Sequence, residues 1–139
     1  MKILILCTGN SCRSQMAEGF LKTFMHDAVI VSAGTNPEKE VNPYAIKVMS
    51  ECNIDISKNK PKNVSDFLNK DFDYLITVCD KAKETCPVFN GKVNKRIHIG
   101  FEDPAYFKGT EEEILNKHRE IRNEIYLKLK DFYNKIIKS

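Results

Sequence analysis

The sequence has 139 residues, of which 42% are hydrophobic and 29% are charged, as is typical of a globular chain that forms one domain with its own core. Its formal net charge of +3, carried by lysines interleaved with polar residues, disfavours nucleic-acid binding. No apolar stretch approaches the roughly 20 residues that span a bilayer, and the start is too short for a secretory signal, so we expect a cytoplasmic protein without a membrane segment.

Short apolar runs alternate with segments of helical periodicity along the chain. The expected strands cover 2–6, 29–31, 74–78 and 96–99. Helices are expected from the loop after the first strand to about residue 26, from Asn42 with Pro43, and from Thr110. Thr110 forms a capping box with Glu113, and the helix that follows has an apolar stripe that includes Ile114 and Ile136. This alternation predicts one α/β domain over 1–139, with a four-stranded parallel sheet of order 2-1-3-4 and helices on both faces.

The most informative segment follows the first strand, where five residues separate Cys7 from Arg13. A tight loop between a strand and a helix points backbone N–H groups inward, and the helix adds the positive end of its dipole. Arg13 offers a planar fork of donors that suits a tetrahedral oxyanion. Gly9 and Asn10 tolerate the positive φ angles that such a loop needs. We therefore expect an oxyanion site in which the pKa of Cys7 lies well below the usual value of about 8.5.

Ser14 lies where its hydroxyl is expected to hydrogen-bond the Cys7 sulfur and favour the thiolate. The loop lacks the Gly-Lys-Ser/Thr ending of a Walker-type loop. The alternative is a buried cysteine at a strand end and an arginine in an unrelated ion pair, which leaves the surrounding loop residues unexplained. The residues expected to bind the anion are Thr8, Gly9, Asn10, Ser11, Cys12 and Arg13.

The chain has five cysteines and is expected in the cytosol. We therefore expect them to be reduced thiols or a group of redox-active cysteines, and not structural disulfides. No pair has the spacing of a zinc site, and the three histidines do not cluster with them, so no metal is expected. Cys52 is expected in the core on the helix that begins at Asn42. Cys12 is expected to be structural or prone to oxidation.

Cys79 and Cys86 carry the second chemical expectation. In the expected sheet, strands one and three are neighbours about 4.8 Å apart, so Cys79 should reach the sulfur of Cys7. If 80–85 is helical, a rise of about 1.5 Å per residue separates Cys79 and Cys86 by about 10 Å. A disulfide needs Cα atoms within about 7 Å. The segment must therefore unwind before these two cysteines can be joined.

The string Cys-Thr-Gly-Asn-Ser-Cys-Arg-Ser-Gln-Met-Ala-Glu-Gly at 7–19 resembles the low-molecular-weight tyrosine phosphatase superfamily, and within it the thioredoxin-coupled arsenate reductases. Gln15 favours the reductases, because the phosphatases usually carry proline there. Further segments that share the resemblance are spread over the chain, at 32–34, 41–43, 55–57, 77–79, 86–87, 100–105, 109–113 and 122–125.

The resemblance implies a three-cysteine relay for arsenic detoxification. Cys7 attacks the arsenic of bound arsenate while Asp103 protonates the departing oxygen. Cys79 then attacks Cys7 and arsenite leaves, after which Cys86 attacks Cys79 and thioredoxin reduces the resulting disulfide. The catalytic residues implied are Cys7, Arg13, Ser14, Cys79, Cys86 and Asp103. Because phosphate has the same charge as arsenate and nearly the same shape, we expect phosphate or sulfate to compete for the loop. We expect no cofactor, since thiols supply the two electrons, and we expect a monomer.

Two other functions remain open from the sequence. A low-molecular-weight phosphatase would use Cys7, Arg13 and Asp103, with Tyr106 and Phe107 as an aromatic wall for its substrate. A redox-sensing or partner-binding module would account for the cysteines but not for Arg13 and Asp103. In addition, Asp103 before Pro104 is a common start of a turn.

One position departs from some reductases of the family. These hold a potassium ion with counterparts of Asn10, Glu18, Ser32 and an aspartate, and the aspartate position is Lys62 here. A lysine repels the cation or replaces it with its own ammonium near Glu18. We therefore predict no specific stimulation by potassium.

Overall fold

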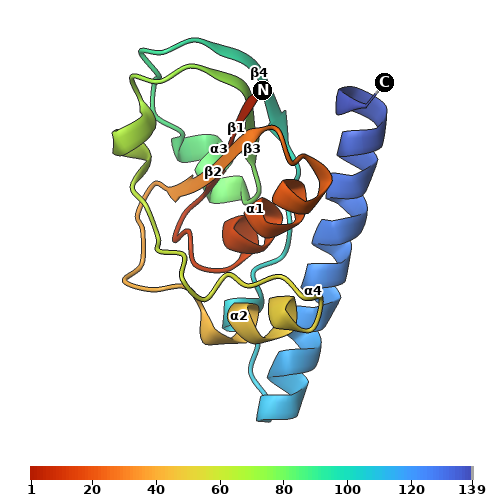
Figure 1. Ribbon diagram of the computed structural model, residues 1–139. Coiled ribbons are helices and arrows are strands. Elements are labelled where there is room, and N and C mark those ends of the chain that lie inside the picture. Colours follow the sequence, from red (N-terminus) through yellow and green to blue (C-terminus); the bar gives the residue numbers. More distant parts are fainter. Residues whose placement is uncertain (139) are drawn as a thin grey trace.

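The computed structural model, which describes residues 1–138, contains one parallel sheet of four strands in the order β2-β1-β3-β4. The strands are β1 (Lys2–Cys7), β2 (Val29–Gly34), β3 (Phe72–Thr77) and β4 (Val93–His98). The helices are α1 (Arg13–Phe24), α2 (Pro43–Ser50), α3 (Asp80–Thr85) and α4 (Glu111–Phe132), with shorter helical segments at Val64–Phe67, Pro104–Tyr106 and Tyr133–Ile137. The expected α/β class and strand order are confirmed, and helices surround the sheet (Figure 1).

Strand β1 lies in the middle of the sheet because its side chains are apolar on both faces. Its residues from Ile3 to Leu6 are fully buried. It pairs with β2 on one side and with β3 on the other, so that Cys7 lies opposite Gly34 and Leu6 lies opposite Thr77. A continuous apolar run without alternation is what a strand in a doubly covered parallel sheet requires.

Helix α4 runs along one side of the molecule and contacts α1 and α2 (Figure 1). The capping box predicted for Thr110 and Glu113 is present, with both hydrogen bonds made. The buried stripe differs from the expectation at its ends: Leu115 is buried, whereas Ile136 is 42% exposed. No helix within residues 1–138 is both long and apolar enough to cross a membrane.

Two further expectations about the elements are corrected by the structure. Strand β2 continues to Gly34 because Ser32, Ala33 and Gly34 all pair with β1. Helix α2 ends at Ser50, and the residues after it form a turn in which Asn53 adopts a φ of 61°. Cys52 therefore lies beyond the helix and is exposed, so its expected place in the core is wrong.

Candidate active site

The site lies where β1 and β3 end, as expected for a parallel α/β sheet. A cavity of about 600 Å³ opens there, lined by Cys7, by residues 8–13 and by Cys79 and Asp103. Asn10 adopts the left-handed conformation, with a φ of 51°. Gly9 does not, contrary to the expectation, and no glycine within residues 1–138 has a positive φ. A side chain at Gly9 would instead press on Glu38, whose side-chain carbon would lie 3.1 Å from the added Cβ.

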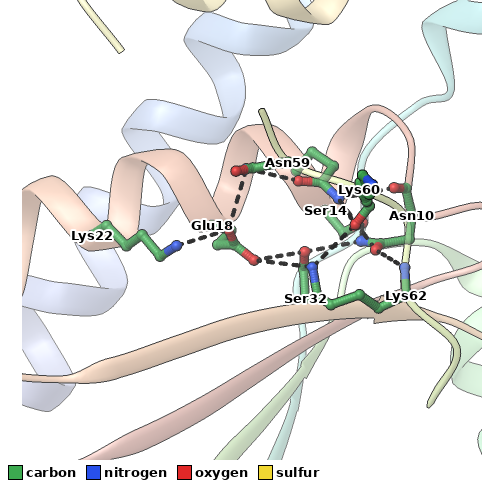
Figure 2. Close-up of polar contacts among 9 residues, drawn as sticks. Asn10, Ser14, Glu18, Lys22, Ser32, Asn59, Lys60 and Lys62 are labelled. Atoms are coloured by element: carbon green, nitrogen blue, oxygen red, sulfur yellow. Dashed lines mark hydrogen bonds and ion pairs between the residues drawn. The ribbon is translucent and has the colours of Figure 1, made fainter. Parts of the chain in front are cut away.

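The amide of Asn10 holds the loop in shape (Figure 2). Its Nδ2 donates to Ser14 Oγ at 2.8 Å and to Ser32 Oγ at 2.9 Å. Its Oδ1 accepts from the backbone N–H of Lys62 at 2.9 Å and from Gln15 Nε2 at 3.2 Å. Asn10 is only 1% exposed, so these bonds are made away from bulk water and fix the strained residue.

Ser14 is fully buried, and the hydrogen bond described for its hydroxyl is the one from Asn10. The expected bond to the Cys7 sulfur is not among the contacts within residues 1–138. Ser14 therefore supports the left-handed residue of the loop. The sequence could not show this, because the partner is set by the direction in which the Asn10 amide points.

Glu18 forms the end of the same polar network (Figure 2). Its carboxylate is 3% exposed. Oε1 accepts from Ser32 Oγ at 2.8 Å and lies 4.0 Å from Lys62 Nζ. Oε2 accepts from Lys22 Nζ at 3.0 Å and from Asn59 Nδ2 at 3.4 Å. Because two ammonium groups already neutralise this carboxylate, the residues do not fit a potassium ion.

The ends of β1 and β3 bring Cys7 and Cys79 together. Both cysteines line the cavity, and the interaction between the two thiols shifts the pKa of each. The Cys79 sulfur also accepts from the backbone N–H of Ala82 at 3.4 Å, as the N-cap of α3, and lies 3.4 Å from the hydroxyl of Thr8. Cys79 is thus surrounded by groups that can donate to a thiolate.

These contacts shift the pKa values of the two cysteines in opposite directions. The hydrogen bond that Cys7 donates to Cys79, together with burial, raises the pKa of Cys7 well above its ordinary value despite the nearby Arg13. The same hydrogen bond, with those from Thr8 and Ala82, lowers the pKa of Cys79 to about 5. The expected low pKa of Cys7 is wrong in this arrangement, because the interaction with Cys79 and burial outweigh the effect of Arg13.

Arg13 and Asp103 form an ion pair in the lining of the cavity. Arg13 Nη2 lies 3.2 Å from Asp103 Oδ2, and Arg13 Nη1 donates to the carbonyl of Phe101 at 3.0 Å. The other carboxylate oxygen of Asp103 accepts from the backbone N–H of Ala105 at 2.9 Å. Asp103 therefore starts a turn, as Asp-Pro sequences commonly do, and also lies at the site.

The remaining two cysteines near the site differ in environment. Cys12 is 5% exposed, and its burial, with Asp103 nearby, raises its pKa to about 12, so it remains a thiol. Cys86 is half-buried at the end of α3 and accepts from Arg96 Nη1 at 3.6 Å. Because α3 is helical from Asp80 to Thr85, the expected need to unwind it applies.

Some contributors to the site were not singled out from the sequence. A side chain at Gly34 would place its Cβ 2.3 Å from the carbonyl oxygen of Thr8, so only glycine lets β2 end against the loop. The family resemblance included the segment 32–34, but it did not show why position 34 needs glycine. The contact of Thr8 with Cys79 was not predicted, although the pairing of β1 with β3 was, because it depends on where the Thr8 hydroxyl points.

A parallel 2-1-3-4 sheet whose first strand runs into a loop that carries a cysteine and an arginine places the chain in a class of α/β enzymes. Residues 2–139 match the family described as low molecular weight phosphotyrosine protein phosphatase. The chain belongs to this family.

Its relatives include proteins named arsenate reductase. That of Bacillus subtilis (strain 168) is 44% identical over 131 residues, which cover 94% of this chain and 93% of the relative. That of Halalkalibacterium halodurans is 41% identical over 130 residues, with 94% and 93% covered. A solved structure described as an arsenate reductase in the phosphate binding state has a TM-score of 0.76 and 30% identity, covering 97% of this chain and 98% of that chain.

Proposed function

We propose that this chain reduces arsenate to arsenite by a relay of Cys7, Cys79 and Cys86. The observation that carries the proposal is that the paired strands β1 and β3 bring Cys7 and Cys79 to one cavity beside the loop, with Cys86 seven residues further along at the end of a short helix. The names of the relatives support the substrate. The chain would need no cofactor, because thiols supply the two electrons.

The first step forms a bond between sulfur and arsenic. Arsenate binds to the backbone N–H groups of the loop and to Arg13, which turns from Asp103 to the anion. The shared proton moves from Cys7 to Cys79, and the Cys7 thiolate attacks arsenic. Asp103, released from its ion pair with Arg13, takes up a proton from solvent and donates it to the departing oxygen, which leaves as water. The product of this step is a Cys7–arsenate adduct.

The second and third steps move the electrons. The Cys79 thiolate, after losing its proton, attacks the Cys7 sulfur, and the electron pair of the sulfur–arsenic bond stays on arsenic, so arsenite leaves. Cys86 then attacks Cys79, which frees Cys7 and leaves a Cys79–Cys86 disulfide. Thioredoxin is the proposed reductant of this disulfide. We propose that the enzyme works as a cytoplasmic monomer and that phosphate or sulfate competes with arsenate.

A second candidate is phosphatase activity at the same loop. It needs only Cys7, Arg13 and Asp103, and Tyr106, which is 83% exposed beside the cavity, could contact an aromatic substrate. The family match supports this chemistry. Phosphorus offers no path comparable to the release of arsenite, so phosphate is a ligand of the loop but is not reduced.

The two functions separate in one experiment. Arsenate-dependent NADPH oxidation is followed with thioredoxin and thioredoxin reductase, using the wild type, Cys79→Ser and Cys86→Ser. The relay predicts no turnover in either variant, while phosphatase activity with an aryl phosphate is retained. Cys52→Ser is the matched control, because Cys52 is exposed outside the site and its loss should leave turnover unchanged. Arsenate turnover that survives in Cys79→Ser or Cys86→Ser would overturn the relay.

A further inference from the structure

Helix α3, which joins Cys79 to Cys86, is weakly supported by the core. It has six residues, and only Ala82 is buried. A cavity of about 240 Å³ adjoins it, lined by side chains of β3 and β4 together with Lys83 and Cys86. A helix this short has little stability of its own, and few buried contacts allow local opening at low free energy. Something other than packing must therefore keep it wound.

The start of α3 is held by His98 on strand β4. His98 Nε2 lies 3.0 Å from Asp80 Oδ1, and His98 Nδ1 lies 2.8 Å from the hydroxyl of Thr77. The Thr77 hydroxyl can donate to Nδ1 while Nε2–H donates to the carboxylate, so one ring orientation satisfies both contacts. A Cβ at Gly100 would lie 2.9 Å from Nε2, so only glycine leaves room for the ring.

The end of α3 is held by Arg96 on the same strand. Arg96 Nη1 donates to the Cys86 sulfur at 3.6 Å, and its guanidinium lies 5.6 Å from the centre of the Phe89 ring. Arg96 and His98 are two residues apart on β4 and therefore point to the same face of the sheet. One face of one strand thus contacts both ends of α3. We call these two contacts, His98–Asp80 and Arg96–Cys86, the β4 clasp.

The clasp fixes the distance between the two ends of α3 at the length of the wound helix. Cys79 and Cys86 are about 10 Å apart along such a helix, and a disulfide requires about 7 Å or less between Cα atoms. Drawing Cys86 to Cys79 shortens the segment, so at least one contact of the clasp must break. We propose that His98 and Arg96 are positioning residues that keep α3 wound in the reduced protein and whose release governs the rate at which Cys86 reaches Cys79. This inference rests on the proposed relay.

The test measures closure of the disulfide without arsenate. Fully reduced protein is treated with the thiol oxidant diamide, and the Cys79–Cys86 disulfide is followed over time by mass spectrometry of linked peptides. Asp80→Ala and His98→Ala should each form this disulfide several-fold faster than the wild type. Asp80→Asn keeps an oxygen that accepts from His98 and should stay within about twofold of the wild type. The double variant Asp80→Ala/His98→Ala should be no faster than either single variant, because both remove the same contact.

Two controls separate the clasp from a general loss of stability. Glu84→Ala removes a carboxylate from the same helix without touching His98 and should leave the closure rate unchanged. Exchange of the Lys83 amide hydrogen, which bonds to the Cys79 carbonyl at 3.2 Å, should be several-fold faster in Asp80→Ala and His98→Ala. This acceleration should exceed any change in global unfolding measured in urea.

The outcomes distinguish a failure of the clasp from a failure of the relay. Equal closure rates in Asp80→Ala and Glu84→Ala, or single effects that add fully in the double variant, would overturn the clasp even if arsenate turnover requires all three cysteines. If arsenate turnover does not require Cys79 and Cys86, the relay is wrong. Faster amide exchange in His98→Ala would then still establish that His98 holds the helix.

Discussion

The proton between Cys7 and Cys79 decides which sulfur is reactive before substrate binds. Cys7 donates, and Cys79 is held as the acceptor by Thr8 and by the Ala82 amide. The pKa of Cys79, the residue proposed to act second in the relay, is therefore lowered. In the proposed relay, Cys7 must therefore lose its proton, with Cys79 as the neighbouring acceptor, before it attacks.

Replacing Cys79 by alanine should make Cys7 more reactive toward alkylation. The substitution removes the hydrogen-bond acceptor and the neighbouring negative charge that raise the pKa of Cys7, and leaves Arg13, which lowers it. At pH 7, iodoacetamide should label Cys7 several-fold faster in Cys79→Ala than in the wild type, as measured on the peptide that carries Cys7. Cys86→Ala, which leaves the pair intact, is the control. Labelling of Cys7 that is equal or slower in Cys79→Ala would contradict the shared proton.

The pairing of Glu18 with Lys62 and Lys22 predicts that potassium has no special effect. The carboxylate that would bind the cation is 3% exposed and already lies near two ammonium groups. At equal ionic strength, potassium and sodium chloride should give the same kcat/KM for arsenate. A several-fold preference for potassium would show that a cation displaces Lys62. The comparison uses the wild-type protein alone, so a folding defect of a variant cannot account for the result.

At the scale of elements, the end of α2 is tied to α4 by one carboxylate. Glu51 accepts from Arg119 Nη2 at 2.8 Å and from Arg122 Nη1 at 2.7 Å. Its hydrogen bonds with Arg119, and next with Arg122, lower the pKa of Glu51 from 4.5 to about 2. Because the folded pKa is lower than the unfolded one, the stabilisation is complete above about pH 5 and is lost as the pH falls through about 2.

Glu51→Gln should therefore lower the free energy of unfolding by about 1 kcal/mol at pH 7, after allowing for solvent screening of a partly exposed pair. The difference from the wild type, measured by urea unfolding, should shrink as the pH is lowered from 5 toward 2. Glu112→Gln is the matched control, because Glu112 makes a 3.3 Å contact with Arg119 but its side chain is 72% exposed. A loss in Glu51→Gln that does not change with pH would show that shape, not charge, is responsible.

The elements most open to prediction were those with a strong local pattern. The apolar run of β1 and the capping box at Thr110 and Glu113 each determine a structure by themselves. The end of α2 was less predictable, because it depends on the left-handed turn at Asn53. The site followed the same rule. The loop could be predicted from its residues, whereas the direction of the pKa of Cys7 depended on Cys79, which is distant in sequence.

At the scale of the whole molecule, the site exists only when the sheet is assembled. Cys7 comes from the end of β1, Cys79 follows β3, and Asp103 follows β4, so three strand ends meet at one cavity. An anion bound there contacts groups that are brought together only in the folded state. Its binding free energy therefore adds to the stability of the fold, by about 2.7 kcal/mol at one hundred times the dissociation constant.

Phosphate should therefore raise the melting temperature in a saturable way that depends on Arg13. For a domain of this size, a gain of 2.7 kcal/mol corresponds to a rise of about 10 °C. Arg13→Ala should lose the saturable part of this rise, because it removes the guanidinium donors that bind the anion and that pair with Asp103 in the free protein. Cys86→Ser should keep it, since Cys86 lies outside the loop. Sodium chloride at matched ionic strength corrects for general salt effects. If phosphate stabilises Arg13→Ala as strongly as the wild type at millimolar concentration, the loop is not the site that binds the anion, and the first step of the proposed reaction loses its basis.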